Sequence, residues 1–166
     1  MKKTLMSLFV VLFACAIQAQ TLKVPTKSDA AKAKENMKTE TSQVSNQANI
    51  GSLLGQLTDN ISDDAFTDSF KKNKTGFLNS LGTVSDAAGA SKALQTLQGG
   101  LLPTAMDSGW GKVKDKWLKD TKAANSVKSV AGVTSTLESN IDDKYFKGNW
   151  AKVRPAWQAG LNTLSK

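Results

Sequence analysis

The chain has 166 residues, 22 of them basic and 14 acidic, with a formal net charge of +8 and an aromatic content of 7%. It contains one cysteine, Cys15, and no histidine. This composition excludes zinc sites built from Cys and His, Ser/His/Asp triads and Cys/His dyads. We therefore expect a protein that is not an enzyme and that holds no cofactor and no metal ion.

Residues 1–19 predict an export signal. Lys2 and Lys3 form a short basic start, and residues 5–17 form an apolar run that is too short to span a bilayer. Ala19 is a suitable residue for cleavage. The alternative interpretation is a membrane anchor that stays in place.

Cys15 offers a second way of processing this segment. Residues 12–15 read Leu-Phe-Ala-Cys, which resembles a bacterial lipobox, although Phe13 fits that motif poorly. Apolar residues also continue to Ile17, as in an ordinary signal peptide. We predict a periplasmic or secreted protein, with lipidation of Cys15 as the alternative and the only route to a membrane.

Residues 20–45 are polar and carry almost no large apolar side chains. Such a segment cannot bury enough surface to offset its ordering entropy, so we predict a disordered tether. Cleavage after Ala19 removes Lys2 and Lys3 from the 22 basic residues, which leaves 20 against 14 acidic residues and a net charge of +6.

From residue 46 onward the sequence repeats with a period of forty residues. We predict one domain of three copies, over about 46–85, 86–125 and 126–166. The columns that define this register are Leu57, Leu97 and Leu137; Ile61, Leu101 and Ile141; Phe66, Met106 and Phe146; Phe70, Trp110 and Trp150; Lys72, Lys112 and Lys152; and Phe77, Trp117 and Trp157.

The first helix of each copy is predicted from apolar residues at helical spacing, i, i+3, i+4 and i+7. Asn60, Gly100 and Asn140 follow these stripes, and we expect them to end each helix in a left-handed conformation. The stripes are Ile50, Leu53, Leu54 and Leu57; Ala90, Ala93, Leu94 and Leu97; and Val130, Val133, Thr134 and Leu137.

A second helix of about twenty residues is predicted in each copy. Ser62 and Asp142 are good N-cap residues, and Pro103 suits the first helical position. Pro155 removes a hydrogen bond from the third copy, so we expect a kink or break near Ala151. The apolar stripes are Phe66, Phe70, Phe77 and Leu81; Met106, Trp110, Val113 and Trp117; and Phe146, Trp150, Val153, Trp157 and Leu161.

These elements predict an all-α fold of three tandem helical hairpins of about forty residues each. A single hairpin cannot bury its own stripe, whereas stacked hairpins share a continuous core. A short solenoid and a compact six-helix bundle both satisfy this pattern.

The tryptophans are the first candidate site. One hypothesis is an aromatic ladder offered to sugar rings or to a partner protein. The favoured interpretation is core, since a stripe on one helical face is the usual core signal. The ring N–H of tryptophan needs a partner, so we expect some of these residues at the edge of the core. They are Trp110, Trp117, Trp150 and Trp157.

A basic column, Lys74, Lys114 and Arg154, recurs beside the tryptophans. These side chains either extend along the aromatic rings to reach water, which is the favoured interpretation, or form a row of cations that binds an anionic polymer. The edge between the two columns is our candidate partner-binding face. A denser set, Lys112, Lys114, Lys116, Lys119 and Lys122, reads as a solvated helix face, with a membrane-surface role as the alternative.

The paired acids Asp63–Asp64 and Asp142–Asp143 are the carboxylate clusters that would suggest catalysis. They stand at predicted helix starts, where capping explains them. The middle copy has Pro103 and Thr104 instead. We assign them no catalytic role.

Together these features predict an exported, non-enzymatic helical-repeat protein that acts as a binding or scaffolding module in a bacterial envelope or secreted space. Its expected partner is an unknown protein or an anionic envelope polymer, and no nucleic acid. The alternative is a cationic envelope-associated protein that binds anionic lipid or glycan, and this binding would weaken steeply with salt.

Overall fold

The computed structural model describes residues 50–166. The predicted signal segment 1–19 with Cys15, and the predicted tether 20–45, lie outside the described residues. The first helix covers residues 50–60. It is followed by η1 (Asp63–Ala65), α2 (Asp68–Leu81), α3 (Ala87–Gly100), η2 (Pro103–Ala105), α4 (Trp110–Ala123), α5 (Val127–Ser139), η3 (Asp143–Tyr145) and α6 (Trp150–Leu164).

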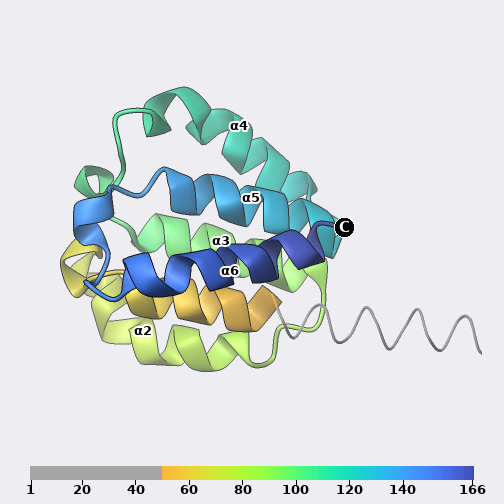
Figure 1. The fold of residues 1–166 in the computed structure, drawn as a ribbon, viewed down its shortest axis with the longest axis horizontal. Coiled ribbons are helices and arrows are strands. Elements are labelled where there is room, and N and C mark those ends of the chain that lie inside the picture. Colours follow the sequence, from red (N-terminus) through yellow and green to blue (C-terminus); the bar gives the residue numbers. More distant parts are fainter. Residues whose placement is uncertain (1–49) are drawn as a thin grey trace, which may run out of the picture.

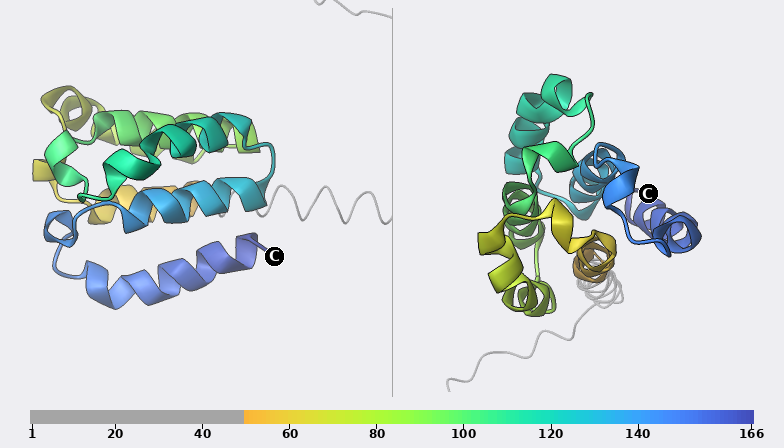
Figure 2. Two further views of the ribbon diagram at one scale, coloured as in Figure 1. Left: turned by 90° about the horizontal axis from the view of Figure 1, so that it is seen from above. Right: turned by 90° about the vertical axis from the view of Figure 1, so that its left-hand side faces the viewer.

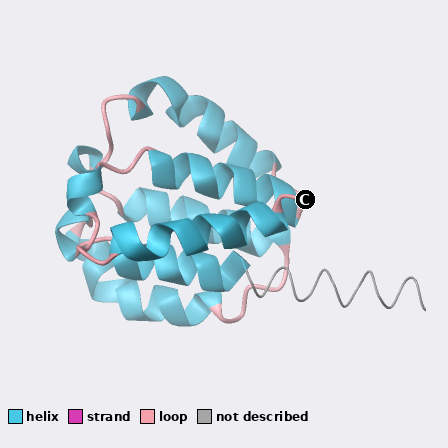
Figure 3. Ribbon diagram, in the orientation of Figure 1, coloured by secondary structure: helices cyan, strands magenta, loops and turns pink. Residues whose placement is uncertain are grey.

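The described part of the chain is all-α, as predicted, and helices joined by loops make up the whole of it (Figure 3). The six α-helices form two layers around a common axis, which is clearest in the right-hand view of Figure 2. The first helix, α3 and α5 lie inside. The outer helices α2, α4 and α6 each cover the junction between two inner ones (Figures 1 and 2).

The three copies close into a ring at one end of the bundle. Isolated antiparallel bridges join Phe66 to Leu101, Met106 to Ile141, and Phe146 back to Ile61. Equivalent main-chain hydrogen bonds accompany them, from Leu102 N to Ala65 O (2.8 Å), from Asp142 N to Ala105 O (3.0 Å) and from Ser62 N to Tyr145 O (2.7 Å). Because the third copy pairs with the first as the first pairs with the second, the fold is a closed, pseudo-threefold six-helix bundle and not an open solenoid.

The predicted stripes of the inner helices form the centre of the core. Each inner helix turns its apolar face to the bundle axis, and all twelve predicted positions are buried. The fourth position of the third stripe is Thr134, whose hydroxyl donates to the carbonyl oxygen of Val130 within its own helix (2.7 Å). The helical-period prediction is therefore confirmed for all three copies.

The inner helices end where the sequence predicts, but not in the predicted conformation. No residue in the described part of the chain has a positive φ. Asn140 caps α5 with φ −108° and ψ 8°, and Gly100 is the last helical residue of α3. Gly100 lacks a side chain for a packing reason, because a Cβ atom there would overlap the ring of Phe70.

The predicted twenty-residue second helix is interrupted. A 3₁₀ turn comes first, then an extended residue such as Phe66 (φ −105°, ψ 150°), and only then the α-helix. The extended residue makes the ring-closing bridge, and this use of the backbone is incompatible with helix. Asp142 caps η3 through the N–H of Lys144 (3.1 Å), whereas the Ser62 side chain accepts no cap bond. Thr67 instead caps α2.

Pro155 does not break the last helix, so the predicted break is wrong. Helix α6 runs without interruption from Trp150 to Leu164. Proline cannot donate to the carbonyl of Ala151, but Ala151 is exposed, and water can take the place of the missing donor.

Candidate functional site

The four tryptophans lie inside the bundle. Their exposed fractions are 6% for Trp110, 2% for Trp117, 3% for Trp150 and 2% for Trp157. In α4 and in α6 the two indoles meet edge to face, with ring centroids 5.5 Å apart. The core interpretation is therefore confirmed, and the expected edge position is wrong. Little of these rings is therefore accessible to a partner in the folded chain.

Two of the indoles also form hydrogen bonds that join an outer helix to an inner one. The Nε1 of Trp117 donates to the carbonyl oxygen of Val133 at 2.7 Å, and the Nε1 of Trp157 donates to that of Leu53 at 2.8 Å. Val133 and Leu53 are pseudo-equivalent, so the threefold relation extends to side-chain hydrogen bonds. The third member of this column is Phe77, which has no donor to offer.

The basic column does not form one row of free cations. Lys74 lies over the ring of Phe66, with Nζ 4.8 Å from the centroid, and its Nζ contacts Asp63 at 2.7 Å. Its side chain is largely covered, so the predicted extension along an aromatic ring is confirmed here. Lys114 is exposed and makes no ion pair within residues 50–166, because Pro103 replaces the aspartate of the other copies.

Arg154 forms ion pairs within the fold that the sequence did not predict. Its Nε lies 2.6 Å from Oε1 of Glu138, and its Nη1 lies 3.3 Å from Oδ1 of Asp143. Glu138 is 1% exposed. A buried carboxylate needs a close partner of opposite charge, so Arg154 is committed to the fold and is not available to a ligand.

The paired acids serve these same contacts. The hydrogen bond from Lys74 lowers the pKa of Asp63, and its positive charge adds to the effect. The hydrogen bond from the Lys144 side chain lowers the pKa of Asp142. Asp143 pairs with Arg154. Three of the four carboxylates, Asp63, Asp142 and Asp143, thus pair with cations near the start of a 3₁₀ turn.

Helix α4 carries the densest exposed positive charge. It holds five lysines against two aspartates, Asp115 and Asp120. Lys116 pairs with Asp120. The remaining lysines make no ion pair within the described part of the chain, and all five are exposed: Lys112, Lys114, Lys116, Lys119 and Lys122.

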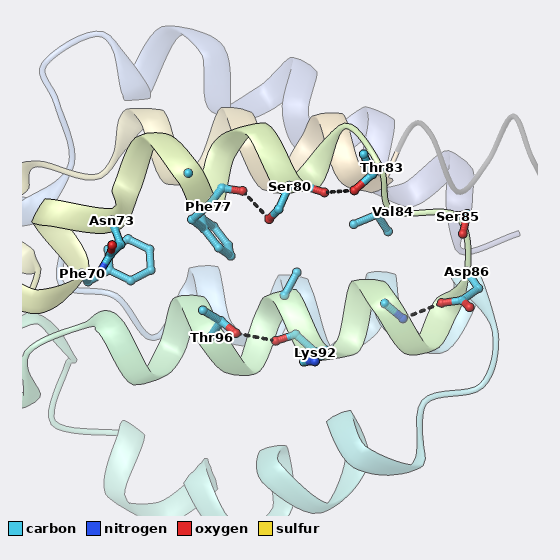
Figure 4. Close-up of a pocket in the computed structure, with 13 residues that line it drawn as sticks. Phe70, Asn73, Phe77, Ser80, Thr83, Val84, Ser85, Asp86, Lys92 and Thr96 are labelled. Atoms are coloured by element: carbon cyan, nitrogen blue, oxygen red, sulfur yellow. Dashed lines mark hydrogen bonds between the residues drawn. The ribbon is translucent and has the colours of Figure 1, made fainter.

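An open groove of about 700 Å³ runs between α2 and α3 (Figure 4). Phe70 lies near one end of it, and Val84 and Asp86 near the other, with Phe77 projecting between the helices. Helix α2 also approaches α3 at fewer positions than α4 approaches α5. The groove walls include Phe70, Phe77, Val84, Lys92, Ala93 and Thr96.

The groove follows from smaller residues at the pseudo-equivalent positions of the first copy. Phe77 stands where Trp117 and Trp157 stand in the other copies, and Ala93 stands where they have Val133 and Leu53. Gly76 adds no side chain, and a Cβ placed there would contact nothing. Sequence inspection showed these replacements, but not that they lie at one interface.

No group of three or more His, Cys, Asp or Glu side chains is placed to hold a metal ion within residues 50–166. In the same range no helix is both long enough and apolar enough to cross a membrane. Comparison with protein-family models, with curated proteins and with solved structures found no match to this chain.

Proposed function

We propose that the protein is an exported, non-enzymatic binding module that holds an anionic polymer of the bacterial envelope against helix α4. The observation that carries this proposal is the set of exposed lysines on α4. All of them except Lys114 lie on one face of an outer helix whose opposite face is anchored in the core by Trp110 and Trp117.

The spacing of these lysines suits an extended chain of negative charges. At 100° per residue, four of them fall within an arc of about 120°. The first and last of them are ten residues apart, or about 15 Å along the helix axis. Asp115 lies within the arc and lowers the local charge. The four are Lys112, Lys116, Lys119 and Lys122.

An acidic glycan fits this face better than a lipid bilayer does. Helices that insert into an interface place large apolar side chains beside their cations. Within residues 50–166, Val153 is the one large apolar residue that is exposed, and it belongs to α6 and not to α4. Contact through charge alone favours a polymer that lies along the surface.

The burial of the tryptophans leaves charge as the means of contact. Sugar-binding sites often stack rings on exposed aromatic side chains, but the indoles of this chain are covered. Lys74 and Arg154, the other cations of the predicted face, are engaged within the fold. Lys114 is exposed and unpaired in the described part of the chain, but it lies beside the tryptophan stripe of α4, outside the arc of the other four lysines.

The test is the binding of a labelled polyuronate, followed by fluorescence anisotropy at low and at physiological salt. Charge reversal in the double variant Lys112→Glu with Lys119→Glu is expected to weaken binding about tenfold, since each exposed ion pair contributes up to about 1 kcal/mol. Binding of the unaltered protein should also weaken as salt rises, because exposed charges are screened.

A matched control separates the α4 face from net charge. Lys128→Glu with Lys152→Glu makes the same change in total charge at exposed positions on α5 and α6. It should reduce binding far less. Equal losses in the two double variants, or binding that ignores salt, would reject the α4 site, and preferential binding to anionic phospholipid vesicles would favour the lipid alternative.

A further inference from the structure

The α2–α3 groove has two filled counterparts elsewhere in the same molecule. At each counterpart an indole lies between an outer and an inner helix and donates its N–H to a main-chain carbonyl. The acceptors there are Val133 and Leu53, and the pseudo-equivalent residue in the groove is Ala93. The counterparts therefore show which chemical group this type of interface accommodates.

The acceptor in the groove, the carbonyl oxygen of Ala93, can accept one more hydrogen bond. A carbonyl oxygen accepts two hydrogen bonds, and in the filled interfaces the helix supplies one donor and the indole the other. Among residues 50–166 no side chain donates to the carbonyl of Ala93. Phe77 supplies an aromatic wall in place of the indole (Figure 4), and it has no donor for that second acceptor position.

The chain has no indole of its own to place there. All four tryptophans are buried in the bundle, so a second copy could supply one only by unfolding. Residues 20–49 contain no aromatic residue. An indole in this groove must therefore come from outside the chain, and a groove of about 700 Å³ is within the size range of small-molecule sites.

The charge at the groove indicates the rest of the ligand. Lys92 belongs to the groove wall and makes no ion pair within the described residues. Asp86, at the far end, already accepts the N–H of Gly89 at 2.5 Å as the cap of α3. Asp86 keeps its negative charge at that end, so the part of the groove that is complementary to a carboxylate lies beside Lys92.

We propose that the α2–α3 groove binds a small aromatic acid with a ring N–H, of the indole carboxylate class. The ring lies against Phe70 and Phe77, the N–H donates to the carbonyl oxygen of Ala93, and the carboxylate contacts Lys92. This site uses none of the α4 lysines, so it can be tested independently of the polymer site.

The probe is indole-3-acetate, titrated into the purified protein by isothermal titration calorimetry. We expect binding at one site per chain. The variant Phe77→Trp places the missing indole in the groove, so it should weaken binding at least tenfold while thermal unfolding shows an intact fold. Binding that survives Phe77→Trp unchanged, or no binding to the unaltered protein at millimolar probe, would overturn the proposal.

Two further measurements hold even if Phe77→Trp fails to fold. Lys92→Gln should weaken indole-3-acetate several-fold and leave uncharged indole unaffected, whereas the control Lys112→Gln on α4 should change neither. The N-methylated probe, which cannot donate to Ala93, should bind about tenfold more weakly. Equal affinity for the methylated probe would refute the carbonyl contact. Tighter binding of a tryptophan-containing peptide than of the free acid would instead assign the groove to a partner protein.

Discussion

The α2–α3 and α4–α5 interfaces occupy equivalent places in the ring, yet they are closed to different degrees. In one, Phe77 faces Ala93 across an open groove. In the other, the indole of Trp117 covers Val133 and donates to its carbonyl oxygen at 2.7 Å. The difference shows that the column of large aromatics is needed to fill an interface but not to form it.

The ring-closing backbone explains why the first copy tolerates the smaller residues. The bridge between Phe66 and Leu101 and its hydrogen bonds match those of the other two copies. Main-chain pairing therefore sets the relative position of neighbouring copies at one end of the bundle. Side-chain packing along the helices is then free to differ between copies.

The same contrast holds for the basic column. Arg154 neutralises the buried Glu138, whereas the pseudo-equivalent Lys114 faces solvent and contacts no acid within residues 50–166. The residues that correspond to Glu138 are Thr58 and Gln98. A repeated cation is thus structural in one copy and free in another.

The largest expected effect distinguishes the filled interface from the open one. Trp117→Ala should lower the free energy of unfolding by about 3–5 kcal/mol, since it removes a buried indole and leaves a cavity. Phe77→Ala should cost only about 1–2 kcal/mol, because Phe77 is half-buried beside the groove. Urea unfolding measures both, and equal losses would mean that the groove is closed in solution.

The next effect concerns the buried ion pair. Arg154→Met should destabilise the protein by about 2–3 kcal/mol because it leaves the buried carboxylate of Glu138 without its positively charged partner. The expected loss is smaller than for a fully buried pair because Arg154 is partly exposed. Lys114→Met should change the unfolding free energy by less than about 0.5 kcal/mol. Adding Glu138→Leu to Arg154→Met should restore most of the loss. If the double variant does not regain stability, the loss in Arg154→Met comes from packing and not from the unpaired charge of Glu138.

A smaller effect is expected when the open interface is given the indole of the filled ones. Phe77→Trp should raise the free energy of unfolding by about 1 kcal/mol, through added burial and a hydrogen bond to Ala93. The melting temperature measures this gain. A loss of stability would show that the backbones of α2 and α3 lie too differently from those of α4 and α5 to accept the larger ring.

The smallest effect depends on pH. Because the pKa of Asp63 is lowered by Lys74, the stabilisation from this pair is present above the ordinary carboxyl pKa of about 3.8 and is lost as pH falls through the lower folded value. Asp63→Asn should therefore destabilise by less than about 1 kcal/mol at neutral pH and by nothing in strong acid. Asp64→Asn is the control, and a difference that persists in strong acid would contradict the role assigned to Lys74.

Several features could be predicted because they depend on local spacing. The forty-residue period, the twelve inner-helix positions and the burial of the tryptophans all follow from apolar residues at helical intervals. The interruption at Phe66 could not be predicted in this way, since an extended residue there is stabilised by pairing with Leu101, which lies in the next copy.

The candidate site was less accessible to sequence reasoning. The lysines of α4 were visible as a charged face, but nothing in the basic column indicated that Arg154 would be committed to Glu138. The groove was also hidden, because Phe77 and Ala93 read as ordinary members of their stripes. The one signal that could have located the groove is that the side chains at two equivalent positions are smaller in the first copy than in the other two.

The sequence by itself determined the helical class, the number of copies and the faces that enter the core, because these depend on residues that are near one another in the chain. Only the tertiary structure decided that the copies close into a ring, that Arg154 is engaged and that one interface stays open. Each of those outcomes depends on contacts between different elements, either within one copy, as for Arg154 with Glu138, or between copies, as for Trp157 with Leu53, which are 104 residues apart.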